Sequence, residues 1–332
     1  MTRLFDAPAL RDQWYVVAES SDLTDRPRAV TLLAERYVLW RDASGCIVAA
    51  ADRCPHRQAP LSDGTVTAGC LTCPYHGWTF GQSGRCVDVP SAGSGLPVPP
   101  AAHLATLQTV ERYGLVWVSP GSPVRDVCLI AEDVDPVYRR INTGIENWRT
   151  HTTRMVDNFL DVAHFPWVHA GTFGSAQDRV APSIEIVDLD SDFTGYRYVV
   201  DVRDGTGRDV RRAMTTGVHL PFTVRSTIRH VTGSEAGLDH ILLLCSTPVD
   251  HESSLFTFVV WRNDDHAVPA EQVVAFDRAI GAEDKRMLER IGGELPLDLR
   301  ATVSVQSDRA SVEWRRRLAA LVASALTSGH VD

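Results

Sequence analysis

Long apolar segments are absent from this sequence of 332 residues, which also has a single lysine, Lys285, among its 33 basic residues. Apolar runs such as Cys46–Ala51 and Ile241–Cys245 fall far short of the roughly 18 to 20 residues that a membrane-spanning helix needs. The N-terminal MTRLFDAPAL lacks the basic start and apolar stretch of a secretory signal. We therefore expect no membrane association and a cytoplasmic location.

Positive charge is also scarce, with 33 basic against 42 acidic residues and a net charge of -9. Nucleic-acid binding is excluded on this ground, because phosphate contacts need a concentrated basic surface. Seven cysteines, an odd number, favour thiols and metal ligands over a disulfide framework. The 44% hydrophobic and 23% charged composition is that of a globular protein whose length allows two domains.

The chain changes character at Ser119–Pro123 (SPGSP), which we take as the boundary between domains 1–120 and 121–332. The first part consists of short strands separated by turn residues. In the second part, residues 183–262 alternate as strands do, and helical periods occupy Pro269–Ile291 and Ser311–Leu326. The predicted class is α+β, with an all-β first domain and a long sheet flanked by helices in the second.

The first group of candidate metal ligands is Cys54-x-His56, followed after sixteen residues by Cys73-x-x-His76. Each half supplies one thiolate and one imidazole from a turn that contains proline. Such a set can bind one tetrahedral zinc ion or a [2Fe-2S] cluster in which one iron has two His ligands. Zinc fingers usually pair like with like. The mixed order therefore favours the cluster.

A second group lies in NFLDVAHFPWVH, within and after a predicted helix, Met155–Phe165. It follows the pattern N-x2-D-x2-H-x4-H, as Asn158, Asp161, His164 and His169. In an undisturbed helix the two histidines would lie about 140° apart, too far to bind one ion. Pro166 lies between them and should kink or break the helix. Both imidazoles can then converge on one metal, and two His with one carboxylate form the facial triad of non-haem Fe(II) oxygenases.

These motifs, together with APLS (Ala59–Ser62) and CPYHGW (Cys73–Trp78), make the sequence resemble the Rieske non-haem iron oxygenases. The resemblance is closest to the oxygenase components of the vanillate and dicamba O-demethylase branch. It implies a Rieske [2Fe-2S] domain held by Cys54, His56, Cys73 and His76, followed by a helix-grip catalytic domain with a mononuclear Fe(II). It also implies that the carboxylate ligand is the Asp of the EDK segment, Asp284. The adjacent Glu283 lies about 100° round the helix, and Asp277 and Asp298 are weaker alternatives.

The resemblance further implies a cyclic homotrimer in which the cluster of one subunit lies near the iron of its neighbour. Asp161 would then bridge the two sites, accepting hydrogen bonds from a cluster histidine of the neighbour and from His164. Asn158, one turn earlier, would lie near the open iron positions. No G-x-G-x-x-G fingerprint is present. Electrons from NAD(P)H are therefore expected through a separate flavin-dependent reductase or ferredoxin.

The predicted activity is monooxygenation of a small aromatic or heterocyclic compound by O2, as O- or N-demethylation or as hydroxylation. Two alternatives stay open: a stereospecific hydroxylase or ring-forming oxidase of a secondary metabolite, and a Rieske electron carrier with a ligand-binding domain. A structural zinc protein is a third. The substrate pocket is expected between the sheet and the iron-bearing helices. Candidate lining residues are His219, Phe222, Cys245 and Trp261.

Overall fold

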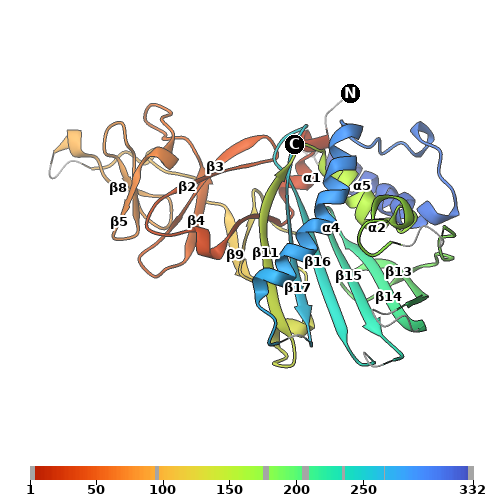
Figure 1. Cartoon of the computed structure of the whole chain (residues 1–332). Helices are drawn as coiled ribbons and strands as arrows, with labels where there is room; N and C mark the ends of the chain where they lie inside the picture. Colours follow the sequence, from red (N-terminus) through yellow and green to blue (C-terminus); the bar gives the residue numbers. More distant parts are fainter. Residues whose placement is uncertain are drawn as a thin grey trace. The chain divides into compact units, whose positions relative to one another are not determined.

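The chain folds into two compact units, Met1–Val127 and Cys128–Asp332 (Figure 1). This computed structural model describes residues 4–93, 97–174, 179–203, 209–233, 236–264 and 266–327. The segment 119–123 lies near the end of the first unit. No helix in the described ranges is both long enough and apolar enough to cross a membrane.

The first unit is built from three small antiparallel sheets and one short helix, α1 (Pro8–Arg11). The first sheet has the order β1 (Tyr15–Glu19), β10 (Leu115–Ser119), β9 (Gln108–Arg112). The second has the order β2 (Arg28–Leu32), β3 (Glu35–Arg41), β4 (Ile47–Ala51). The third has the order β5 (Thr65–Thr67), β6 (Cys70–Thr72), β7 (Thr79–Phe80), β8 (Cys86–Asp88).

A shared apolar core joins the second and third sheets of this unit. Trp40 from β3 and Leu71 from β6 are fully buried in it, together with Cys54 and Cys73. The two cysteines lie in the connections β4 to β5 and β6 to β7. Burial of the cysteines in the core fixes one end of each loop, which positions the ligand residues that follow.

The second unit is a seven-stranded antiparallel sheet with helices on one face. The strand order is β11 (Arg139–Trp148), β17 (Ser254–Arg262), β16 (Asp239–Pro248), β15 (Thr223–His230), β14 (Asp209–His219), β13 (Thr194–Arg203), β12 (Ile186–Asp188). Successive strands from β12 to β17 are neighbours, and β11 pairs with the last of them. The helices are α2 (Thr152–Leu160), α3 (Phe165–Val168), α4 (Ala270–Ile291) and α5 (Arg309–Thr327). This architecture confirms the predicted α+β class.

The helix-facing side of the sheet is identified by its packing. Phe256, Phe258 and Val260 of β17 contact a cluster that includes Met155 of α2 and Leu288 of α4. Because side chains alternate along a strand, Trp261 points to the opposite side, where its indole N–H donates to Asp133. Cys245 likewise alternates with Leu244, which faces the helices. The expectation that Trp261 and Cys245 line a pocket beneath the helices is therefore wrong.

Candidate metal centres

The two loops that carry Cys54 and Cys73 have the same backbone design. The Cys54 carbonyl accepts from the Gln58 N–H at 2.8 Å, and the Cys73 carbonyl accepts from the Gly77 N–H at 3.1 Å. In each loop the fourth residue after the cysteine has a positive φ, 61° at Gln58 and 72° at Gly77. Glycine adopts this conformation without strain. Two equivalent turns therefore present one Cys and one His each.

The aromatic side chains of these loops lie against one another. The His56 and His76 rings meet edge to face, with centroids 4.5 Å apart, and Trp78 stacks on His56 at 4.6 Å. The Nδ1 atom of His56 is buried and has no hydrogen-bond partner among the described residues. Burial raises the pKa of the Cys54 thiol to about 11, so that a thiolate here needs a cation. These properties fit a ligand set for iron.

Zinc and a [2Fe-2S] cluster make different demands on the four side chains. Zinc bonds of about 2.0 to 2.3 Å would bring all four ligand atoms close together. In the described ranges, the set of ligand atoms that lie within 4.8 Å of one another is His164, His169 and Asp284 in the second unit. The cysteine and histidine loops do not form such a single-ion group. A [2Fe-2S] cluster places two irons between the two cysteines and the two histidines, so it does not require all four ligand atoms to lie so close together.

The second set begins where α2 ends, at Asp161. The Asp161 backbone is extended, and its carboxylate accepts from the N–H groups of Ala163 at 2.9 Å and His164 at 3.0 Å. These bonds replace the helical ones and start a new turn at His164. Pro166 lies in the first turn of α3, where its missing N–H has no cost. The prediction that Pro166 breaks the helix is therefore wrong. The helix ends at Asp161, before His164.

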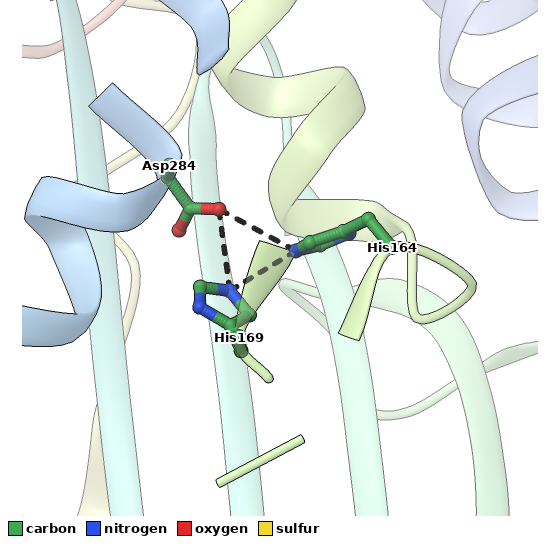
Figure 2. Close-up of side chains that lie close together, drawn as sticks. All are labelled: His164, His169 and Asp284. Atoms are coloured by element: carbon green, nitrogen blue, oxygen red, sulfur yellow. Dashed lines mark hydrogen bonds and ion pairs between the residues drawn. The ribbon is translucent and has the colours of Figure 1, made fainter. Parts of the chain in front are cut away.

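The new turn brings His164 and His169 to the two ends of α3 and directs both rings to one point. Their Nε2 atoms lie 3.3 Å apart. Asp284 of α4 directs Oδ1 at both, 3.5 Å from His164 Nε2 and 3.2 Å from His169 Nε2. Figure 2 shows the three side chains converging from the two helical segments, with strands of the sheet behind them. Asp277 and Asp298 do not belong to this group.

The tautomers of the two histidines follow from their outer contacts. His164 Nδ1 lies 2.9 Å from Asp161 Oδ2, and His169 Nδ1 lies 2.9 Å from Glu283 Oε2. An ionised carboxylate only accepts, so each Nδ1 carries the proton. Neutral imidazoles then present two Nε2 lone pairs to each other and to a carboxylate oxygen. This arrangement is repulsive unless a cation lies among the three atoms, so the residues fit a divalent metal.

The attraction of this group of side chains for positive charge also shifts the pKa values of His164 and Asp284. Burial alone lowers the pKa of His164, but the carboxylates of Asp161 and Asp284 outweigh it and raise the pKa to about 9. Burial raises the pKa of Asp284, and the two histidines outweigh it and lower the pKa to about 2. In the absence of a metal, a proton therefore occupies His164 at neutral pH. Metal binding must displace that proton.

Glu283 contacts the triad although it is not one of its three ligands. Its direction on the helix, about 100° from that of Asp284, excludes it from the metal. Glu283 contacts Nδ1 of His169, whereas Asp284 contacts Nε2 of the same ring. Glu283 also accepts from the Thr172 hydroxyl at 2.8 Å. The adjacent pair Glu283 and Asp284 therefore holds His169 from both sides of its ring.

Asn158 and Asp161 lie beside a hollow of about 390 Å³ in the second unit. His164 forms part of the same wall, and Met287 and Ile291 of α4 line another part. The Nδ2 group of Asn158 is buried and has no hydrogen-bond partner among the described residues. A bound molecule or a second protein surface could supply one. His219, Phe222, Cys245 and Trp261 do not line this hollow.

Comparison with known families accounts for both centres. Residues 13–110 match the Rieske [2Fe-2S] domain, and residues 148–324, just over half of the chain, match the vanillate O-demethylase oxygenase C-terminal domain. The chain belongs to this family of Rieske non-haem iron oxygenases. The oxygenase family assigns a [2Fe-2S] cluster to the first unit and a mononuclear iron to the second.

Individual relatives are similar to this chain over different shares of its length. Methylxanthine N1-demethylase NdmA of Pseudomonas putida is 29% identical over 321 residues, 93% of this chain and 88% of that protein. The oxygenase component of dicamba O-demethylase of Stenotrophomonas maltophilia is 35% identical over 66% of this chain and 64% of that protein. The solved structure of Pseudomonas putida NdmA with caffeine has a TM-score of 0.84 and 27% identity, covering 96% of this chain and 93% of that one.

Proposed function

We propose that this oxygenase demethylates a small aromatic or heterocyclic substrate in the cytoplasm. One oxygen atom of O2 enters a C–H bond of an O-methyl or N-methyl group. The hemiacetal or hemiaminal then releases formaldehyde, and the second oxygen atom leaves as water with two electrons and two protons. The observation that carries the proposal is the converging triad of His164, His169 and Asp284 in a chain whose first unit is a Rieske domain. Relatives named as O- and N-demethylases support the reaction.

Each group near the triad has a defined task. When bound, iron at the triad supplies O2 activation and the cluster supplies single electrons. Asp161 and Glu283 keep the Nδ1 protons of the two histidines in place, so that both Nε2 atoms stay available as ligands. Because the triad supplies only three ligands, it would leave positions on a bound iron open to other molecules. Asn158, with its unpartnered buried amide group, is suited to orient a molecule beside those positions.

Asp161 is also suited to form a hydrogen-bonded bridge between the triad and the cluster of another subunit. Its side chain keeps 27% of its surface exposed although it bonds to His164. A carboxylate has room for a further donor, and the adjacent hollow gives access to it. We place a cluster histidine of a neighbouring subunit there, in a cyclic homotrimer. Cys54, His56, Cys73 and His76 hold that cluster, and a reductase or ferredoxin reduces it. Arg53 and Arg57 are exposed beside the loop and suit an acidic donor.

The proposal is tested by metal analysis and product analysis of one preparation. We expect about three irons per chain, two in the cluster and one at the triad, with visible and EPR spectra of a Rieske centre. Turnover with NADH, a reductase and a methylated aromatic compound should release formaldehyde. An oxygenated product that keeps all carbon atoms would contradict demethylation, and two irons without turnover would indicate an electron carrier.

A further inference from the structure

Asp277 lies on the same side of α4 as the metal-site residue Asp284. Seven residues of an α-helix turn by about 700°, nearly two turns, and advance by about 10.5 Å. Between them, a Cβ at Gly281 would lie 3.6 Å from the Phe256 ring and 3.7 Å from the Trp148 ring. This side of α4 therefore faces the sheet. Asp277 shares the metal site's side of the helix, two turns away.

One oxygen of the Asp277 carboxyl group has no partner in the described part of the fold. Its Oδ2 atom is buried and has no hydrogen-bond partner among the described residues. Burial raises the pKa of this group to about 6, and the charge of Arg262 opposes the rise. Arg262, however, donates to Asp264 at 2.5 and 3.0 Å, and His240 Nε2 lies 3.0 Å from the same carboxylate. These basic groups are directed to Asp264.

An apolar surface lies next to these groups on the helix-facing side of the sheet. Leu242 is paired with Val260, and Leu244 with Phe258. Both leucines pack against the cluster beneath α2 and α4, yet both remain only partly buried. Partly covered leucines on an inward face offer a surface on which a flat apolar ring can lie. A buried carboxylate oxygen that has no partner near such a surface is suited to accept a hydrogen bond from a ligand.

We propose that Asp277 determines substrate class by accepting a hydrogen bond from an N–H, O–H or ammonium group of the substrate. The ring of the substrate lies on the surface of Leu242 and Leu244, and its methyl group faces the triad. The site therefore takes a small aromatic ether or N-methyl compound with a donor at the end remote from the methyl group. It discriminates against carboxylates, because a second negative charge next to buried Asp277 is repelled. This inference rests on the proposed demethylation.

Three ethers that share the methoxy group and differ at the para position provide the test: 4-methoxybenzylamine, 4-methoxybenzyl alcohol and 4-methoxybenzoate. Binding to the iron-loaded protein is measured by calorimetry at pH 8, where Asp277 is ionised. We expect the amine to bind about 10- to 100-fold more tightly than the benzoate, with the alcohol between them. Equal affinities for amine and benzoate, or no binding of any ether at millimolar concentration, would overturn the proposal.

Asp277→Asn keeps the shape of the side chain and removes its charge. We expect it to weaken amine binding at least tenfold, to strengthen benzoate binding, and to leave the visible spectrum of the cluster and the iron content unchanged. Glu271→Gln is the matched control, because it removes a carboxylate from an exposed position of the same helix. It should leave the affinities for all three ethers unchanged. An equal effect of the two variants would show that only net charge matters and would overturn the proposal.

Formaldehyde release from the three ethers separates this inference from the proposed function. Selective binding that depends on Asp277, without formaldehyde from any bound ether, would contradict demethylation and leave the binding site standing. Formaldehyde from the benzoate in both wild type and Asp277→Asn at equal rates would support demethylation and overturn the role of Asp277.

Discussion

Glu283 and Asp284, adjacent on α4, contact the two different nitrogens of one imidazole. Glu283 Oε2 lies 2.9 Å from His169 Nδ1, and Asp284 Oδ1 lies 3.2 Å from His169 Nε2. The histidine is thereby fixed between a carboxylate that orients it and a carboxylate that can share a metal with it. Because both contacts come from one rigid helix, the position of α4 relative to α3 determines the geometry of the site.

Replacement of Asp284 should abolish metal binding at the triad without affecting the cluster. Asp284→Ala removes the only anionic ligand and leaves the two histidines, which is too few for stable iron binding. We expect iron to fall from about three to about two per chain, with an unchanged Rieske EPR signal and no turnover. Glu271→Ala, an exposed residue of the same helix, is the control. Retention of the third iron in Asp284→Ala would exclude it as a ligand.

Replacement of Glu283 should weaken the same site without removing a ligand. Glu283→Ala leaves His169 Nδ1 without its acceptor, and loss of such an outer partner lowers metal affinity by roughly 10- to 100-fold. Iron release to a chelator, followed after reconstitution, measures the change. Glu283→Gln offers an amide oxygen to the same N–H and should recover much of the affinity. Equal iron release from wild type and Glu283→Ala would contradict the orienting role.

The four cluster residues and the two histidines of the triad could be predicted because they belong to short local motifs. Asp284 is distant from these histidines in the sequence, and only the resemblance to a known family indicated it. The helix at α4 and the strands of the second unit were also predictable, since their apolar periods are regular. The end of helix α2 at Asp161 could not be predicted. Proline is a strong breaking signal in a sequence, whereas capping by the Asp161 carboxylate depends on a side-chain conformation that only the folded chain shows.

The contact of Glu283 with His169 could not be predicted for a related reason. A difference of about 100° between adjacent helix positions excludes two carboxylates from one metal. It does not exclude them from opposite sides of one ring, because an imidazole presents its two nitrogens in different directions. The burial of Asp277 Oδ2 without a partner among the described residues could not be predicted either. Arg262 and His240 contact Asp264, and no local pattern of α4 reveals these contacts.

Asp161→Asn should separate electron transfer from metal binding. The amide oxygen of Asn can still accept from both the N–H and Nδ1 of His164, as Asp161 Oδ2 does, so the triad should retain its iron. The variant loses the negative charge that couples His164 to a neighbouring cluster. We expect turnover to fall by roughly 10- to 100-fold, while the reductase reduces the cluster at its usual rate. Stopped-flow reoxidation of the reduced cluster by O2 with substrate present measures the step. An unchanged rate would contradict the bridging role.

Asp277→Asn should stabilise the fold, and the gain should depend on pH. The pKa of this carboxyl group is raised from 3.8 to about 6 in the folded chain because it is buried. The folded state therefore holds the proton more tightly, and stability is lost as pH rises from 3.8 through 6, when the buried group must ionise. A rise of about two pKa units lowers the free energy of unfolding of the wild type by about 3 kcal/mol above pH 7, and by about half of that at pH 5.

Urea unfolding of wild type and Asp277→Asn at pH 8 and pH 5, followed by tryptophan fluorescence, compares the stability gained at the two pH values. Equal gains at both pH values would show that ionisation of Asp277 does not limit stability.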